Sequence, residues 1–174
     1  ILATAGRATE ERPYALCPAY TFVGTAVALQ QCGYVPWLVD VESRAWQMQP
    51  SALLAHPALP RCGVVLPVAP YGRMPPLGEW ARFRRRTGVP VVVDGAAAIE
   101  ALLAAPEALA EGVPVALSFH ATKALPTGEG GAVVTSDDAL GLAAFRALNF
   151  GFFMTRESRG PSINGKMPEH AAAL

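Results

Sequence analysis

Residues 113–123 read Val113-Pro114-Val115-Ala116-Leu117-Ser118-Phe119-His120-Ala121-Thr122-Lys123. The first half is a short apolar run of the kind that forms a buried strand, and the second half brings hydroxyl groups and an amine to the end of that strand. The run does not alternate apolar with polar residues, which is typical of a strand covered by helices on both faces. This stretch therefore predicts one strand of an α/β fold, with a candidate reactive group at its end.

Four further apolar runs share this character and predict more strands of the same sheet: Val35–Val39, Val64–Val68, Val89–Val93 and Ala132–Val134. Because apolar residues recur on one face and capping residues stand at the ends, helices are expected over Thr21–Gln31, over Pro76–Thr87 and from Ser136 onward. The alternation of strands and helices predicts a three-layer α/β fold, in which helices cover both faces of a mostly parallel sheet.

The composition excludes several classes of protein. Of 174 residues, 52% are apolar and 16% are charged, and the formal net charge is zero. Such a chain is not disordered and has no overall charge that would gather nucleic acid or an anionic membrane. The basic run Arg82–Arg86 falls at the end of a predicted helix, where positive charge suits the helix dipole, so a solvated helix end is the preferred interpretation.

Cysteine and histidine positions give no sign of a metal site. Cys17, Cys32 and Cys62 are odd in number and form no close pair, which predicts reduced thiols rather than disulfides or ligands. The three histidines lie far apart in the sequence and lack zinc-type spacing to the cysteines. No apolar run reaches the roughly 20 residues that span a bilayer. We therefore expect no metal, no membrane partner and a cytoplasmic location.

Two reactive groups end predicted strands. Asp94 directly follows Val91–Val93, and Lys123 follows the run quoted above. Active sites of open α/β sheets lie at the carboxyl ends of the strands. A carboxylate there can keep the nitrogen of a heteroaromatic ring protonated, and a buried lysine amine can form a Schiff base with an aldehyde.

Both groups also have ordinary explanations. Asp94 could cap a helix or join an ion pair, and Lys123 could be a surface lysine of a loop. Lys123 is one of only two lysines in the chain, the other being Lys166, which favours a functional role. The glycine-rich stretch Thr127–Gly131 lacks the lysine and hydroxyl of a Walker loop. It reads as a turn that lets the backbone pass close behind Lys123.

Together these motifs resemble the sugar aminotransferases of the DegT/StrS type, which are fold-type-I pyridoxal-phosphate enzymes. Ser118–Lys123 and Thr127–Thr135 look like the lysine loop and the following strand of that family, and Pro18–Val23 looks like its early strand-to-helix turn. Asn164–Glu169 is similar to its Asn-Gly-Lys-Met-Ser-Glu stretch, with Pro168 in place of serine. The similarity covers nearly the whole chain in the expected order.

The resemblance implies a pyridoxal-phosphate-dependent aminotransferase. It would move an amino group from an amino acid, expected to be glutamate, to a nucleotide-linked keto-sugar of polysaccharide biosynthesis. Lys123 would carry the Schiff base and shuttle a proton, Asp94 would pair with the pyridinium nitrogen, and Ser118 would bind the phosphate. Phe22 would stack on the ring, and Asn164 would reach the phosphate of a neighbouring subunit, which implies a homodimer.

Two departures from the family pattern matter. Ala97 stands where the family usually has a glutamine near the phenolic oxygen of the cofactor, so the electronics of the Schiff base are expected to differ. The family's Gly-Thr helix start and its small C-terminal domain have no counterpart in the sequence. Residues 1–174 are therefore expected to be a cofactor-binding large domain that is incomplete at both ends.

Three alternatives stay open from the sequence. A sugar dehydratase of the same family would, by the resemblance, carry a histidine in place of Lys123, so the lysine disfavours that reaction. A non-catalytic descendant that binds cofactor or sugar nucleotide is motivated by Ala97. A plain nucleotide-binding domain lacks the expected Gly-x-Gly-x-x-Gly after a strand. Arg156 and Arg159 could meet a diphosphate or carboxylate, or could simply be solvated loop charges.

Overall fold

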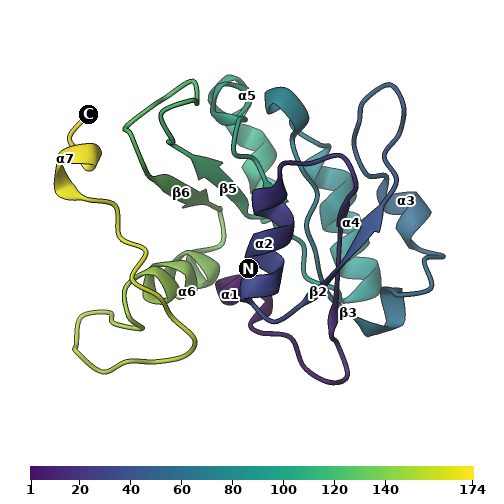
Figure 1. The fold of residues 1–174 in the computed structure, drawn as a ribbon, viewed down its shortest axis with the longest axis horizontal. Helices are drawn as coiled ribbons and strands as arrows, with labels where there is room; N and C mark the ends of the chain where they lie inside the picture. Colours follow the sequence, from purple (N-terminus) through teal and green to yellow (C-terminus); the bar gives the residue numbers. More distant parts are fainter.

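The structure, a computed structural model, describes residues 1–174 and shows strands and helices alternating along the chain (Figure 1). Its strands are β1 (Tyr14–Pro18), β2 (Val35–Val39), β3 (Cys62–Val65), β4 (Val93–Asp94), β5 (Val115–Ser118) and β6 (Gly131–Val134). Its helices are α1 (Leu2–Ala5), α2 (Val23–Gln31), α3 (Pro50–Leu53), α4 (Leu77–Thr87), α5 (Ile99–Ala104), α6 (Asp138–Leu148) and α7 (Glu169–Ala172).

The six strands form two hydrogen-bonded groups of three. Hydrogen bonds join them in the orders β2-β1-β3 and β4-β5-β6. Two isolated parallel bridges, Val65 to Val91 and Val68 to Asp94, connect β3 to the segment of β4. All pairs are parallel except β5 with β6, which is antiparallel and sets Ser118 opposite Gly131. The expected α/β fold with a mostly parallel sheet is confirmed.

Helices pack on both faces of the central strands. On one face, Leu29 of α2 joins Cys17 of β1 and Val64 of β3 in a buried cluster. On the other, Trp80 of α4 packs with neighbouring strand residues in a larger cluster that includes Leu16, Val65 and Val93. Successive residues of β1 and β3 thus face opposite clusters, as the pleat of a strand requires. Figure 1 shows α2 and α4 on either side of the sheet.

Several expectations about single elements need correction. The strand β2 is not covered on both faces: Val35 is 55% and Leu38 is 57% exposed, because β2 lies at the edge of the sheet. The run Val89–Val93 contributes only a bridge at Val91 and the two-residue strand β4. Pro90 has no N–H to donate, which limits regular pairing there. The buried strand β1 was not predicted from its own residues.

The helices follow the predicted pattern more closely. In α4, Leu77, Trp80 and Ala81 are buried as expected, and Gly88 ends the helix in the left-handed conformation. The basic run at its end is solvated apart from Arg84, which donates to the carbonyl of Gly112 (2.8 Å), and Arg85, which lies 3.8 Å from Glu111. In α6 the N-cap is Asp137, whose carboxylate accepts from the Leu140 amide.

Cysteines, candidate metal ligands and helix lengths complete the description. All three cysteines are buried and free. Burial raises the pKa of the Cys17 thiol to about 11. Histidine, cysteine and acidic side chains nowhere gather in groups of three or more that could hold a metal ion. No helix combines the length and the apolar character that crossing a bilayer requires.

Candidate active site

A cavity of about 590 Å³ lies where four strands end. Its walls come from the segments that follow β1, β3, β4 and β5, the edge at which open α/β sheets bind ligands. Three of the five predicted site residues, Phe22, Asp94 and Lys123, line this cavity. The other lining residues are Tyr20, Thr21, Gly24, Thr25, Val68, Ala69, Pro70, Tyr71, Ala96 and Ala97.

Asp94 is held firmly at the floor of the cavity. Its backbone N–H donates to Pro67 (2.8 Å), and its carboxylate accepts from the Thr25 hydroxyl (2.6 Å) and the Ala96 amide (3.1 Å). Thr25 stands in the first turn of α2, where the helix dipole stabilises a negative charge, and its hydroxyl is also bonded to Thr21 (2.6 Å). A carboxylate can accept more than two hydrogen bonds, so Asp94 can still receive a proton-bearing ring nitrogen.

Lys123 comes from a turn after β5. Its backbone N–H donates to His120 (2.9 Å), and the turn is closed by bonds from Phe119 to Gly130 (2.9 Å) and from Ala121 to Gly128 (2.8 Å). The half-buried side chain makes no hydrogen bond within the protein, so its amine is available to a ligand. The glycine that makes a close approach is Gly131, which passes behind β5 and not behind Lys123: a Cβ there would lie 2.5 Å from the carbonyl oxygen of Leu117.

Phe22 forms the aromatic side of the cavity. It is the N-cap residue of α2 and is 80% exposed, so it does not belong to the buried face of that helix. The reason is that the helix begins one residue later, at Val23, which turns the Phe22 ring out toward the cavity. An exposed aromatic face at this place can pack on a flat heteroaromatic ring.

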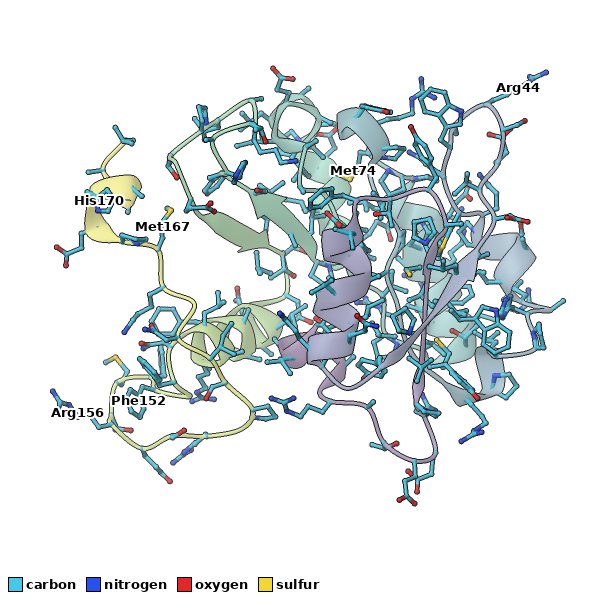
Figure 2. The ribbon with its side chains drawn as sticks, in the orientation of Figure 1. Arg44, Met74, Phe152, Arg156, Met167 and His170 are labelled. Atoms are coloured by element: carbon cyan, nitrogen blue, oxygen red, sulfur yellow. The ribbon has the colours of Figure 1, made fainter.

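Ser118 and Asn164 do not line the cavity. The Ser118 hydroxyl accepts from the His120 amide (3.2 Å) within the lysine turn. Asn164 is exposed and forms an isolated bridge with Asn149, in the segment that follows α6. Arg159 in this segment pairs with Glu157 (2.6 Å), and Figure 2 shows Arg156 at its outer edge. The structure therefore brings together only part of the predicted set.

The sequence did not single out the two tyrosines of the cavity. The hydroxyls of Tyr20 and Tyr71 lie 2.8 Å apart, and this hydrogen bond is the main reason that the pKa of Tyr20 is raised. Tyr71 has a positive φ of 50°, which costs a non-glycine residue about 1–2 kcal/mol. Its position between Pro70 and Gly72, in the connection from β3 to α4, was the available signal.

These residues fit pyridoxal phosphate. An amine, a fixed carboxylate and an exposed aromatic ring share one cavity, and its size is in the range of small-molecule sites. The amine suits the aldehyde of the cofactor and the carboxylate suits its ring nitrogen.

Comparison with known proteins agrees with the site. The model of the DegT/DnrJ/EryC1/StrS aminotransferase family matches residues 3–174. Protein Rv3402c of Mycobacterium tuberculosis is 36% identical over 175 residues, which cover 97% of this chain and 42% of that protein. The UDP-2-acetamido-2-deoxy-3-oxo-D-glucuronate aminotransferase of Pseudomonas aeruginosa is 30% identical over 160 residues, or 91% of this chain and 44% of that protein.

The crystal structure of DesI in the presence of its TDP-sugar product is also similar. It superposes with a TM-score of 0.78 at 28% identity, over 99% of this chain and 43% of DesI. The chain thus spans less than half the length of these relatives.

Proposed function

Because the chain belongs to the DegT/DnrJ/EryC1/StrS aminotransferase family, whose members use pyridoxal phosphate, we propose that it carries the cofactor site of a sugar aminotransferase. The observation that carries this proposal is the cavity shared by Phe22, Asp94 and Lys123. On this view residues 1–174 form the cofactor-binding large domain. The donor is an amino acid, with glutamate the first to test, and the acceptor is a nucleotide-linked keto-sugar.

Asp94, Lys123 and Phe22 would each have a defined task at the cofactor. Bound pyridoxal phosphate supplies an electron sink for bonds at the carbon that carries the amino group. Asp94, oriented by Thr25 and the Ala96 amide, holds a proton on the ring nitrogen. Lys123 would hold the cofactor through its Nζ, and the same amine would carry the proton that leaves or reaches the substrate carbon. Phe22 packs on the ring and limits its rotation.

Three parts of the proposal concern residues outside the cavity. We infer that Ser118 contacts the phosphate once its hydroxyl turns from the His120 amide. Asn164, exposed and distant from the cavity lining, serves the site of a second copy in a homodimer. A reducing location such as the cytoplasm suits the three free cysteines.

Borohydride trapping tests the role of Lys123. The purified chain is incubated with pyridoxal phosphate and reduced, and the adduct is located by mass spectrometry. We expect modification of Lys123 in the wild type and in Lys166→Ala, which removes the only other lysine. Lys123→Ala should give no adduct. Modification of Lys166 instead, or an unchanged yield in Lys123→Ala, would contradict the assignment.

Amino transfer is tested separately with glutamate. The loaded chain should convert its cofactor to the pyridoxamine form, seen by absorption, and release one equivalent of 2-oxoglutarate. Lys123→Ala should lose this reaction, while Lys166→Ala should keep it. A trapped adduct without keto-acid release across a panel of amino donors would instead favour a non-catalytic cofactor-binding protein.

A further inference from the structure

Three exposed aromatic side chains form one cluster at the cavity, which we call the aromatic rim: Tyr20, Trp46 and Tyr71. The ring centroids of Tyr20 and Trp46 are 5.6 Å apart, and those of Trp46 and Tyr71 are 5.8 Å apart. Tyr20 and Tyr71 line the cavity, whereas Trp46 stands behind them and contacts both rings. Tyr71 is 79% exposed and the other two are about half exposed (44% and 46%).

The loop that carries Trp46 is built to hold its shape. The Glu42 carboxylate accepts from the backbone amides of Arg44 (2.8 Å) and Ala45 (2.7 Å), and the Trp46 amide donates to the Glu42 carbonyl (2.8 Å). The Glu42 carboxylate thus binds backbone amides of its own loop. The Arg44 side chain points outward into solvent (Figure 2). An exposed tryptophan on such a loop loses little conformational freedom when a ligand binds.

The same loop is fastened to the tyrosine turn. Gln47, which is buried, donates from its side chain to the carbonyl of Arg73 (2.7 Å), two residues after Tyr71. Arg73 in turn donates to the carbonyl of Arg44 (3.2 Å). The turn also packs closely on the segment after β4, since a Cβ on Gly72 would lie 2.6 Å from the Ala97 carbonyl oxygen. The rim is therefore a rigid unit.

Two of the three rim residues have a strained backbone. Four non-glycine residues have positive φ, and two of them are Trp46 (57°) and Tyr71 (50°). Bulky residues adopt this conformation only where the surroundings impose it, and such strain gathers at ligand sites. Both strained residues are exposed and lie outside the core: Tyr71 lines the cavity, and Trp46 packs on the Tyr71 ring.

We propose that the aromatic rim binds the pyranose ring of the amino acceptor, an inference that rests on the function proposed above. A sugar ring has apolar C–H faces and a polar edge of hydroxyls. Aromatic rings suit such a face, and the paired Tyr20 and Tyr71 hydroxyls suit the edge. One of these hydroxyls donates to the other, which leaves one O–H free to donate and both oxygens able to accept.

The position of the rim favours the sugar ring over the base of the nucleotide. The ring that bears the reacting carbon must approach Lys123, and Tyr20 and Tyr71 line the same cavity as that lysine. In a nucleotide-linked sugar the diphosphate separates the base from the ring, so the base lies farther out. The Thr25 hydroxyl donates to Asp94 and Thr21 is bonded to Thr25, so the hydroxyl of the cavity wall with an O–H left to donate is one of the tyrosine pair.

Calorimetric titration of the pyridoxal-phosphate-loaded chain tests this inference. The probes are TDP-glucose, UDP-glucose and GDP-mannose, each with its nucleoside diphosphate alone, and the tightest pair is carried forward. We expect Trp46→Ala and Tyr71→Phe each to raise the Kd of the sugar nucleotide about 2- to 12-fold. The Kd of the diphosphate alone should change less than twofold.

Trp37→Ala is the matched control, because Trp37 is also a half-exposed tryptophan but packs on Tyr14 and His56 away from the cavity. It should leave both Kd values unchanged. Thermal melting of each variant verifies that it is folded.

Four results would overturn the inference. The diphosphate alone could lose as much affinity as the sugar nucleotide, which would place the base on the rim. A second such result is that the substitutions leave both Kd values unchanged. A third is that none of the probes binds the wild type. Trp46→Ala could convert a dimer to monomers in size-exclusion chromatography, which would make the rim an interface between copies. If the Lys123 adduct forms normally in any of these cases, only this inference fails; without the adduct, the proposed function itself fails.

Discussion

Asp94 and Lys123 line the same cavity but are held in opposite ways. Asp94 ends the short strand β4 between buried neighbours and has two side-chain hydrogen bonds within the protein. Lys123 lies in a turn closed by glycines, and its amine has no partner in the protein. The group that orients a ring is thus fixed by the core, while the group that must form and break a bond is left free to move.

This contrast has a simple origin in packing. Asp94 comes directly after Val93, and both Val91 and Val93 are fully buried in the larger core cluster. The next residue, Gly95, has no room for a side chain, since a Cβ there would lie 2.5 Å from Val115. At the tip of the lysine turn the space is open, since a Cβ on Gly128 would meet nothing within 4 Å. Local stability should therefore differ between the two regions.

Hydrogen exchange should show the largest difference. The amide of Asp94 donates to Pro67 at 2.8 Å and that of Lys123 to His120 at 2.9 Å, so bond length does not distinguish them. Because one bond lies within the sheet and the other in an exposed turn, we expect the Asp94 amide to exchange at least about a thousand-fold more slowly. NMR or mass-spectrometric exchange measures this. Equal protection would mean that the turn is as well ordered as the sheet.

Truncation of the two groups should separate them by free energy. Asp94→Ala leaves the Thr25 hydroxyl and the Ala96 amide without their acceptor, and we expect a loss of about 2–3 kcal/mol. Lys123→Ala removes no hydrogen bond and should change the free energy of unfolding by no more than about 0.5 kcal/mol. Urea unfolding measures both values without cofactor. A larger loss for Lys123→Ala would contradict the contrast.

Alanine at two glycines probes the backbone around each group. Gly95→Ala must displace the buried Val115 side chain, so we expect a loss of roughly 1–2 kcal/mol together with weaker cofactor binding. Gly128→Ala has space but a φ of +88°, and should cost about 1 kcal/mol through backbone strain. Thermal melting and a cofactor titration distinguish the two cases. If Gly95→Ala binds cofactor as well as the wild type, the Val115 side chain must shift without displacing Asp94.

The smallest effect concerns the loop that carries Trp46. Hydrogen bonds from the Ala45 and Arg44 amides hold the pKa of Glu42 below its usual value of 4.5. A carboxyl whose pKa is lowered by folding stabilises the protein above the unfolded pKa, and that contribution disappears as the pH falls through the lowered folded value. We expect the melting temperature to fall slightly more between pH 6 and pH 3 in the wild type than in Glu42→Gln. Identical pH profiles would show that Glu42 does not stabilise the loop.

The sequence predicted the sheet class and most of its strands, and three of the five proposed site residues line one cavity, while their roles toward a cofactor stay predictions. Apolar runs without alternation indicated strands covered on both faces, and this was correct for β3 but wrong for β2, since a run of letters does not show which strand lies at an edge. The strand β1 was not predicted, because its sequence Tyr-Ala-Leu-Cys-Pro carries no strong strand signal. Whether Ser118 and Asn164 reach the cofactor stays a prediction.

By itself, the order of residues determined which chemical groups follow which strands, because a parallel sheet brings the carboxyl ends of its strands to one edge. That was enough to expect a carboxylate and an amine in one place. Only the tertiary structure decided that Tyr20, Trp46 and Tyr71 meet beside the cavity. These contacts join segments up to 51 residues apart, and they depend on side-chain directions and left-handed backbone angles that no local pattern encodes.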